Sequence, residues 1–101
     1  MQFVYTVFPN RDEAMQIGRS AVQEHLAACF NAFPIESAYW WDGEVVENQE
    51  IGVLFKTLSR RRTDLMKFIK NNHSYETPCI VAWEAEHVDP TYREWIQRNV
   101  T

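Results

Sequence analysis

The middle of the chain carries the signature of a long β-hairpin: residues 36–57 read ESAYWWDGEVVENQEIGVLFKT. The dipeptide Asp42-Gly43 favours a two-residue type I′ turn, because that turn needs positive φ at both central positions. Strand-like residues flank the turn, so we predict strands over Glu36–Trp41 and Glu44–Thr57. The second half of the return strand is apolar on both alternating faces, which predicts a strand in the centre of a sheet.

The segments before the hairpin predict two more strands and a helix. Pro34 precedes the hairpin, and because proline within a sheet belongs at an edge or a bulge, we predict a separate strand over Ala28–Phe33. A β-branched and aromatic run over Phe3–Phe8 predicts the first strand. Asn10 is a favourable N-cap with Glu13 in the capping-box position, and the apolar spacing that follows is helical.

The segments after the hairpin complete a familiar element order. We predict a second helix capped by Ser59 and ended by Asn71-Asn72, a polar loop over His73–Pro78, and a strand over Cys79–Glu84. Asp89-Pro90 then opens a short last helix, with proline at the first helical position. The predicted fold class is α+β: a ferredoxin-like βαββαβ sandwich in one domain of 101 residues, with a long central hairpin and an extra short C-terminal helix.

The composition excludes several classes of partner. A formal net charge of -4 argues against generic nucleic-acid binding, which needs a basic surface. No apolar run reaches the roughly 18–20 residues that span a bilayer, so we expect no membrane partner. Aromatic residues make up 14% of the chain, including four tryptophans. That is more than one small core needs, and it predicts rings at an interface with another subunit or a ligand.

The cysteines and the start of the chain predict a location. Two cysteines, Cys29 and Cys79, are too few for a disulfide scaffold. The first residues lack the basic segment and apolar core of a secretory signal. We therefore expect reduced thiols and a cytoplasmic protein.

No residue pattern predicts catalysis, and we expect that the protein is not an enzyme. A nucleophile elbow, a glycine-rich loop and a P-loop are missing from a chain with three glycines. The tract Arg60–Arg62 lies at a predicted helix N-terminus, where anions bind. The alternative is a solvated basic turn that Asp64 partly neutralises.

The loop after the second predicted helix is the first candidate site. His73, Tyr75 and Glu76 place an imidazole, a phenol and a carboxylate in a segment that should be exposed. Imidazole and carboxylate suit Cu(II) or Zn(II), so His73 and Glu76 are predicted metal ligands, with a third ligand from elsewhere, such as a neighbouring subunit. The alternative is that the His and Glu side chains hydrogen-bond to the backbone and lock the turn. His25, on the apolar side of the first helix, is expected to be a core histidine.

Consecutive aromatic residues before the turn are the second candidate. Tyr39, Trp40 and Trp41 cannot all enter one small core, so we predict that they contribute to a protein interface.

Five motifs occur in a characteristic order: AACFN at 27–31, SAYWWDG at 37–43, Lys56-Thr57, HSYETP at 73–78 and YREW at 92–95. In this order and at these spacings they resemble the CutA family of divalent-cation tolerance proteins, over nearly the whole chain. The family's loop usually has proline where this chain has Ser74, which predicts a less rigid loop.

The resemblance implies a cytosolic homotrimer linked to tolerance of copper and other divalent ions. It implies that His73, Tyr75 and Glu76 line a site between subunits, and it matches Cys29, Trp41 and Lys56 to further motif positions. With Tyr39, these residues form the predicted intersubunit or ligand pocket. We expect weak metal or small-ligand sites at the subunit junctions, with no obligatory cofactor and Cu(II) or Zn(II) as ligands.

A second function is compatible with the same fold. Small trimeric regulatory proteins of this subunit fold would bind an anionic metabolite or nucleotide, here through Lys56 and Arg60–Arg62. The two functions differ in the charge of the ligand that they predict.

Overall fold

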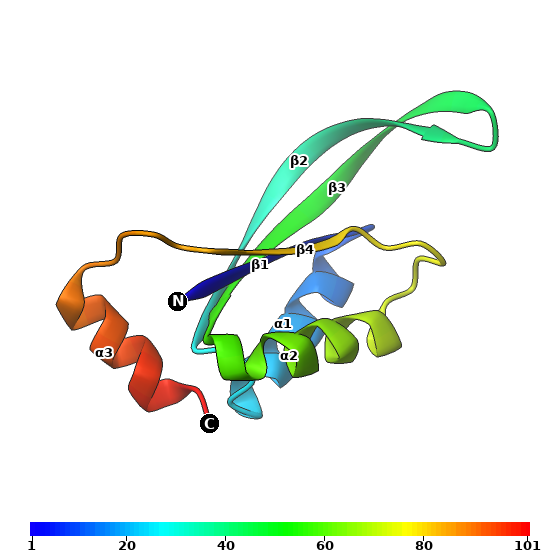
Figure 1. Cartoon of the computed structure of the whole chain (residues 1–101). Coiled ribbons are helices and arrows are strands. Elements are labelled where there is room, and N and C mark those ends of the chain that lie inside the picture. The colour runs from blue at the N-terminus through cyan, green and yellow to red at the C-terminus, as the bar shows by residue number, and fades with distance from the viewer.

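A four-stranded antiparallel sheet in the order β2-β3-β1-β4 is the frame of the computed structural model, which describes residues 1–101 (Figure 1). The elements in chain order are β1 (Gln2–Phe8), α1 (Arg11–Gln23), β2 (Cys29–Trp41), β3 (Glu44–Thr57), α2 (Ser59–Asn72), β4 (Ile80–Glu84) and α3 (Pro90–Asn99). This βαββαβ order with a C-terminal helix confirms the ferredoxin-like prediction.

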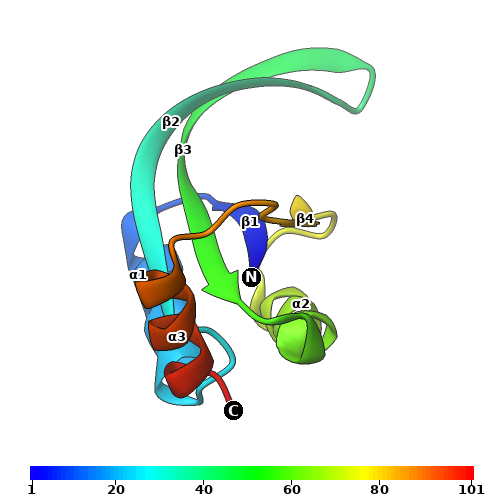
Figure 2. The same ribbon diagram turned by 60° about the vertical axis from the view of Figure 1, so that its left-hand side comes forward.

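The main core lies between the sheet and the helices α1 and α2, which cover the same face (Figures 1 and 2). Alternate residues of β1, including Val4 and Phe8, are fully buried on that face. Phe55 of β3 and Leu65 of α2 belong to the same cluster. A second, smaller cluster holds α3 at one end of the sheet and consists of Ala28, Leu58, Ile96 and Val100.

The hairpin of β2 and β3 extends beyond this layered body. Trp41 pairs with Glu44 across a turn in which Asp42 and Gly43 have φ of 51° and 79°, as the type I′ prediction requires. Figure 2 shows the far half of the hairpin bending over the sheet face that carries no helix. Hairpin residues 35–41 and the open-face residues Tyr5 and Val7 line the same groove.

The prediction that Pro34 separates two strands is wrong. β2 runs without interruption from Cys29 to Trp41, and Pro34 pairs with Ile51 of β3. β2 is an edge strand, and β3 is its only partner. A proline whose nitrogen points away from β3 therefore removes no hydrogen bond between the two strands.

Two predictions about the first helix have different outcomes. The Asn10 side chain accepts a hydrogen bond from the Glu13 N–H at 2.9 Å, which confirms the N-cap. The helix ends at Gln23, however, and His25 lies beyond it with φ of 58°. His25 is exposed, and its Nδ1 lies 3.1 Å from the Asn99 carbonyl oxygen, so the prediction of a core histidine is wrong.

The later boundaries shift by one residue. Ser59 is the first residue of α2 rather than its cap, because Leu58 holds the N-cap position without a side-chain hydrogen bond. Cys79 precedes β4 and is exposed. α3 begins at Pro90 as predicted, and the Asp89 side chain caps it by accepting a hydrogen bond from the Tyr92 N–H at 3.2 Å.

The excess of aromatic residues is found at the surface. Trp40 is 75% exposed and Trp41 is 52% exposed, and Trp83 on β4 is exposed as well. β2 and β4 also leave their outer edges unpaired in the protomer. One copy of the chain therefore leaves both apolar rings and backbone hydrogen-bonding groups uncovered.

None of the helices has the length and apolar character required to cross a bilayer.

Candidate functional site

The loop between α2 and β4 is fastened to the sheet by His73. The ring Nε2 lies 2.8 Å from the Val7 carbonyl oxygen, to which it must donate, and Nδ1 accepts from the Tyr75 N–H at 3.1 Å. The ring stacks on Phe8 with centroids 4.5 Å apart, and the side chain is 0% exposed. The loop is exposed at Ser74, Glu76 and Thr77, as expected of this segment, but the His73 side chain is buried within it. The contacts of His73 match the alternative, in which this side chain hydrogen-bonds to the backbone and locks the turn. Its role as a metal ligand stays a prediction.

The same loop is tied to the first helix through Ser74. Glu13 Oε2 accepts hydrogen bonds from the Ser74 N–H at 3.2 Å and from its hydroxyl at 2.9 Å. The Glu13 carboxylate therefore bonds to the loop. It does not accept the hydrogen bond from the Asn10 N–H that would complete a capping box. The resemblance predicted a less rigid loop here, because Ser74 takes the place of the family's proline. In the structure, two hydrogen bonds hold Ser74 to Glu13.

A buried carboxylate lies beside this loop. Glu50 of β3 is 7% exposed, and its Oε2 accepts a hydrogen bond of 2.6 Å from the Tyr75 hydroxyl. No Lys, Arg or His side chain forms an ion pair with it. Burial and this hydrogen bond raise the pKa of Tyr75 well above its usual 10. Burial, followed by the Glu50 charge, also raises the pKa of the Cys79 thiol.

A groove of about 1030 Å³ lies between the hairpin and this loop. Consecutive residues 35–41 of β2 form one wall, and residues 74–79 form the other. Its aromatic lining consists of Tyr5, Tyr39, Trp40, Trp41 and Tyr75. Its acidic lining consists of Glu36, Glu50 and Glu76. The structure therefore brings four predicted site residues together here: Tyr39, Trp41, Tyr75 and Glu76.

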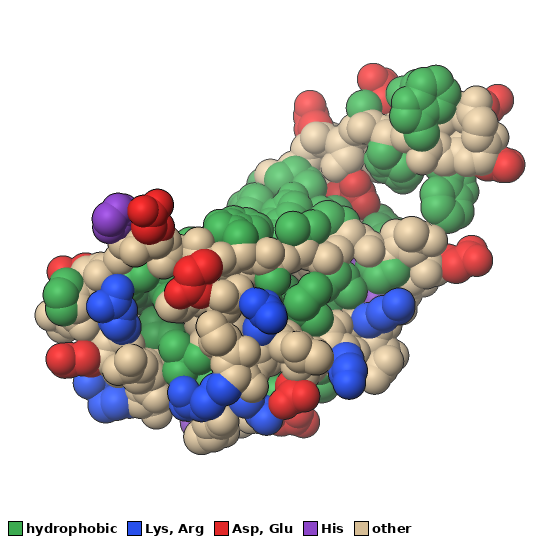
Figure 3. All heavy atoms as spheres, viewed as in Figure 1, with side chains coloured by type: hydrophobic (Ala, Val, Ile, Leu, Met, Phe, Trp, Pro, Cys, Tyr) green, Lys and Arg blue, Asp and Glu red, His purple; other side chains and the backbone are tan.

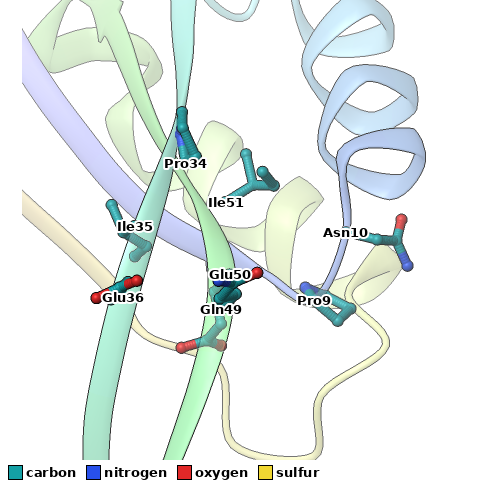
Figure 4. A pocket seen from close by; sticks show the side chains of 8 residues that line it. All are labelled: Pro9, Asn10, Pro34, Ile35, Glu36, Gln49, Glu50 and Ile51. Carbon is teal, nitrogen blue, oxygen red and sulfur yellow. The ribbon is translucent and has the colours of Figure 1, made fainter.

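A smaller hollow of about 520 Å³ adjoins the hairpin near the start of α1 (Figure 4). Pro9 and Asn10 form the α1 side, and residues 34–36 and 49–51 form the hairpin side. Glu36 and Glu50 line both the hollow and the groove. These two carboxylates therefore give an acidic character to both.

Two other predicted pocket residues, Cys29 and Lys56, lie elsewhere. They pair with each other across β2 and β3, and neither lines the groove. Lys56 Nζ donates to Asn31 Oδ1, and the Cys29 sulfur lies 3.5 Å from the Tyr92 hydroxyl. Burial and this contact with Cys29 raise the pKa of Tyr92 to about 12. These residues form a separate polar cluster near α3.

The arginine tract is largely engaged within the protomer. Arg60 donates to the Val100 carbonyl oxygen at 2.7 Å, and Arg61 forms an ion pair with Asp64 at 2.9 Å. With Lys56 bonded to Asn31, most of the cations that would receive an anionic metabolite already have partners. The anion-binding alternative is therefore not favoured.

Two residues of the site were not predicted as site residues. Glu50 carries a weak signal, since it is a carboxylate at the start of the apolar half of a central strand. Nothing in the sequence indicates that Glu13 holds the loop, because its position predicts a capping residue of the first helix. No group of three or more His, Cys, Asp or Glu side chains in the protomer is placed to hold a metal ion.

Comparison with known proteins agrees with this fold over the whole chain. Residues 2–99 match the family described as CutA1 divalent ion tolerance protein. The divalent-cation tolerance protein CutA of Thermotoga maritima is 41% identical, over 99% of both chains. Crystal structures of CutA1 from Pyrococcus horikoshii and of the periplasmic divalent cation tolerance protein CutA from Archaeoglobus fulgidus both superpose with a TM-score of 0.96. The Pyrococcus horikoshii protein is 30% identical, and the match covers 100% of this chain and 99% of that one. The Archaeoglobus fulgidus protein is 35% identical, and the match covers 100% of both chains. The chain therefore belongs to the CutA1 divalent ion tolerance family.

Proposed function

We propose that the protein acts in divalent-cation tolerance as a homotrimer with a ligand groove at each subunit junction. The observation that carries this proposal is the position of the groove along an unpaired edge. One wall is formed by consecutive residues of β2, the edge strand whose outer side has no partner in the protomer. A neighbouring copy that covers this edge would also close the groove, and three copies are the number that the family resemblance implies.

The donor groups of the groove suit divalent ions only in part. Glu36, Glu50 and Glu76 supply carboxylate oxygens, and Cys79 supplies a sulfur atom. Because the protomer has no group of three such ligands, the neighbouring subunit must complete any site for Cu(II) or Zn(II). Binding is therefore expected to be weak and to depend on assembly.

We further propose that this is a binding protein of the cytoplasm rather than an enzyme. Both cysteines are free, which suits a reducing compartment. Cell fractionation with an antibody against the native protein tests the location. Recovery in the periplasm, the compartment named for the Archaeoglobus fulgidus relative, would contradict it.

Light scattering at micromolar concentration tests the assembly. The mass should be close to that of three 12.0 kDa subunits. Trp41→Asp places a charge on a half-exposed ring and should shift the mass toward that of the protomer. Thr63→Asp adds the same charge on an exposed part of α2 and should leave the assembly unchanged. A monomeric wild type, or a Trp41→Asp variant that assembles normally, would refute the proposed interface.

Equilibrium dialysis with Cu(II) and Zn(II) tests the ligand. Glu76→Gln should weaken binding by the assembled protein, whereas Glu44→Gln, an equal change of charge at the hairpin tip, should not. His73→Ala tests whether the predicted histidine ligand contributes. Stoichiometric binding that survives Glu76→Gln would place the metal outside the groove.

A further inference from the structure

We propose that the outward face of α2 binds an acidic segment of a partner protein. The docking surface is the row formed by Arg60, Lys67 and Lys70, here called the basic row. It lies on the helical layer, whereas the groove of the proposed function lies between the hairpin and the loop that follows α2. The two surfaces are separate, so the basic row adds a partner to the proposed function and does not depend on it.

Positive charge is concentrated on α2. This helix carries five basic residues and one acidic residue, whereas α1 carries two of each and the hairpin from Cys29 to Phe55 carries no basic residue. Figure 3 shows blue Lys and Arg side chains over the part of the helical body where α2 runs in Figure 1, while the projecting hairpin shows acidic and hydrophobic side chains. An anionic group is therefore attracted to α2 and repelled from the hairpin, although the chain as a whole has a formal net charge of -4.

The basic row follows one side of the helix. Arg60, Lys67 and Lys70 are exposed, and their spacings of seven and three residues place them on the same side of an α-helix. The buried residues Leu65 and Ile69 lie on the opposite side and belong to the main core. The row therefore points away from the sheet. A neighbouring copy that covers the β2 edge and the open face of the sheet leaves it accessible.

The charges of the basic row are not neutralised within the protomer. Lys67 and Lys70 form no ion pair, and Arg60 donates to the uncharged carbonyl group of Val100. The single carboxylate of α2 pairs with Arg61 instead. An approaching carboxylate therefore meets cations for which no anion of the chain competes.

The distribution of charge in α2 also disfavours the helix itself. The helix opens with Ser59 and three arginines, its first turn has no acidic residue, and no side chain caps it. Positive charge near a helix N-terminus is unfavourable, and like charges one turn apart, such as Lys67 and Lys70, repel each other. Folding alone gives no reason for this arrangement, whereas a bound acidic segment offsets both costs.

The dimensions of the basic row favour a short polypeptide over other anions. Arg60 and Lys70 are ten residues apart, which is about 15 Å along a helix axis. A single small anion cannot reach both ends, whereas about five residues of an extended acidic chain can. A membrane surface or a nucleic-acid duplex needs a wider basic surface, and the neighbouring helix α1 has equal numbers of acidic and basic residues. An acidic protein segment therefore fits this surface best.

The test is a titration of the assembled protein with a fluorescein-labelled octaglutamate peptide at low ionic strength, followed by fluorescence anisotropy. Binding should saturate at one peptide per subunit and weaken as NaCl is added, because the contacts are between exposed charges. The combined substitutions Lys67→Gln and Lys70→Gln should weaken binding by about tenfold. The matched control combines Arg11→Gln and Arg19→Gln, which remove two exposed positive charges from α1 and should weaken binding by less than about twofold.

A gain of binding provides a second measurement. Asp64→Asn removes the one negative charge of α2 and frees Arg61, so it should strengthen peptide binding, which a damaged fold would not do.

Four outcomes would overturn the inference. They are a wild type without saturable binding, an equal loss from the α1 and α2 substitutions, an Asp64→Asn variant that binds more weakly than the wild type, and tighter binding of phosphatidylglycerol vesicles or of a DNA duplex than of the peptide. The last outcome would assign the surface to a membrane or to nucleic acid instead.

Discussion

The carboxylate of Glu13 accepts two hydrogen bonds from Ser74, one from the amide at 3.2 Å and one from the hydroxyl at 2.9 Å. The two residues are 61 positions apart in the chain, so this contact joins the start of α1 to the loop after α2. The next residue on one side is His73, which accepts from the Tyr75 amide, and Tyr75 donates to Glu50. A continuous set of hydrogen bonds thus holds one wall of the groove in place.

Ser74→Ala removes one charge-assisted hydrogen bond from this set and leaves the amide bond intact. Because the site is exposed, the free energy of unfolding should fall by only about 1 kcal/mol. Urea denaturation at a fixed protein concentration measures the change, since assembly contributes to stability. Thr101→Ala is the control, because Thr101 is exposed and its hydroxyl has no hydrogen bond within the protomer. Equal effects of the two substitutions would show that the Glu13 contact contributes nothing.

His73→Ala should destabilise the metal-free protein. The substitution leaves the Val7 carbonyl and the Tyr75 amide without their ring partners and opens a cavity beside Phe8. The expected loss is about 2–4 kcal/mol, measured by urea denaturation in the presence of a chelator.

The control for this prediction is His87→Ala. The His87 side chain is 93% exposed, so its removal should change the free energy of unfolding very little. If His73→Ala were harmless in the chelator and destabilising only when metal is present, a ligand role for His73 would replace the structural one.

Gly18→Ala should lower stability even though alanine favours helices. A Cβ at Gly18 would lie 2.7 Å from ring atoms of Phe30, which packs against the core. The overpacking costs about 1–3 kcal/mol and outweighs the gain of about 1 kcal/mol in helix propensity. Thermal and urea denaturation measure the difference.

A double-mutant cycle with Phe30→Leu identifies the cause of that loss. The smaller side chain makes room for the new methyl group, so the two substitutions together should cost less than their sum. Strict additivity would mean that the close approach of α1 to Phe30 is not what disfavours alanine.

Tyr92 should make stability fall at high pH. Burial and the Cys29 contact raise its pKa to about 12, so the folded protein favours the neutral phenol. This contribution is complete below the ordinary pKa of about 10 and is lost as the pH rises from there to about 12. Tyr92→Phe should remove it, which urea denaturation across this pH range measures.

Absorbance near the phenolate band gives an independent reading of the same group. The titration of the folded wild type should lose its component near pH 12 when Tyr92 is replaced by phenylalanine. Tyr5 and Tyr75 also have raised pKa values, so the comparison of the two proteins isolates Tyr92. Identical titration curves for both proteins would contradict the assignment.

The sequence by itself determined the features that depend on neighbouring residues. Asp42-Gly43 sets the turn and the pairing of Trp41 with Glu44, because φ is positive at both turn positions. Asn10 and Asp89 cap their helices through contacts three residues away. Conformational preference and spacing along the chain suffice for such features.

Only the tertiary structure decided what depends on contacts between distant segments. Pro34 does not break β2, because its strand lies at the edge of the sheet. His73 forms a hydrogen bond with a carbonyl 66 residues away, and Tyr75 forms one with Glu50 across 25 residues. The groove arises because the hairpin bends over the open face of the sheet. Burial and hydrogen-bond partners are properties of the packed chain, and no local pattern of residues encodes which distant group will satisfy a given polar atom.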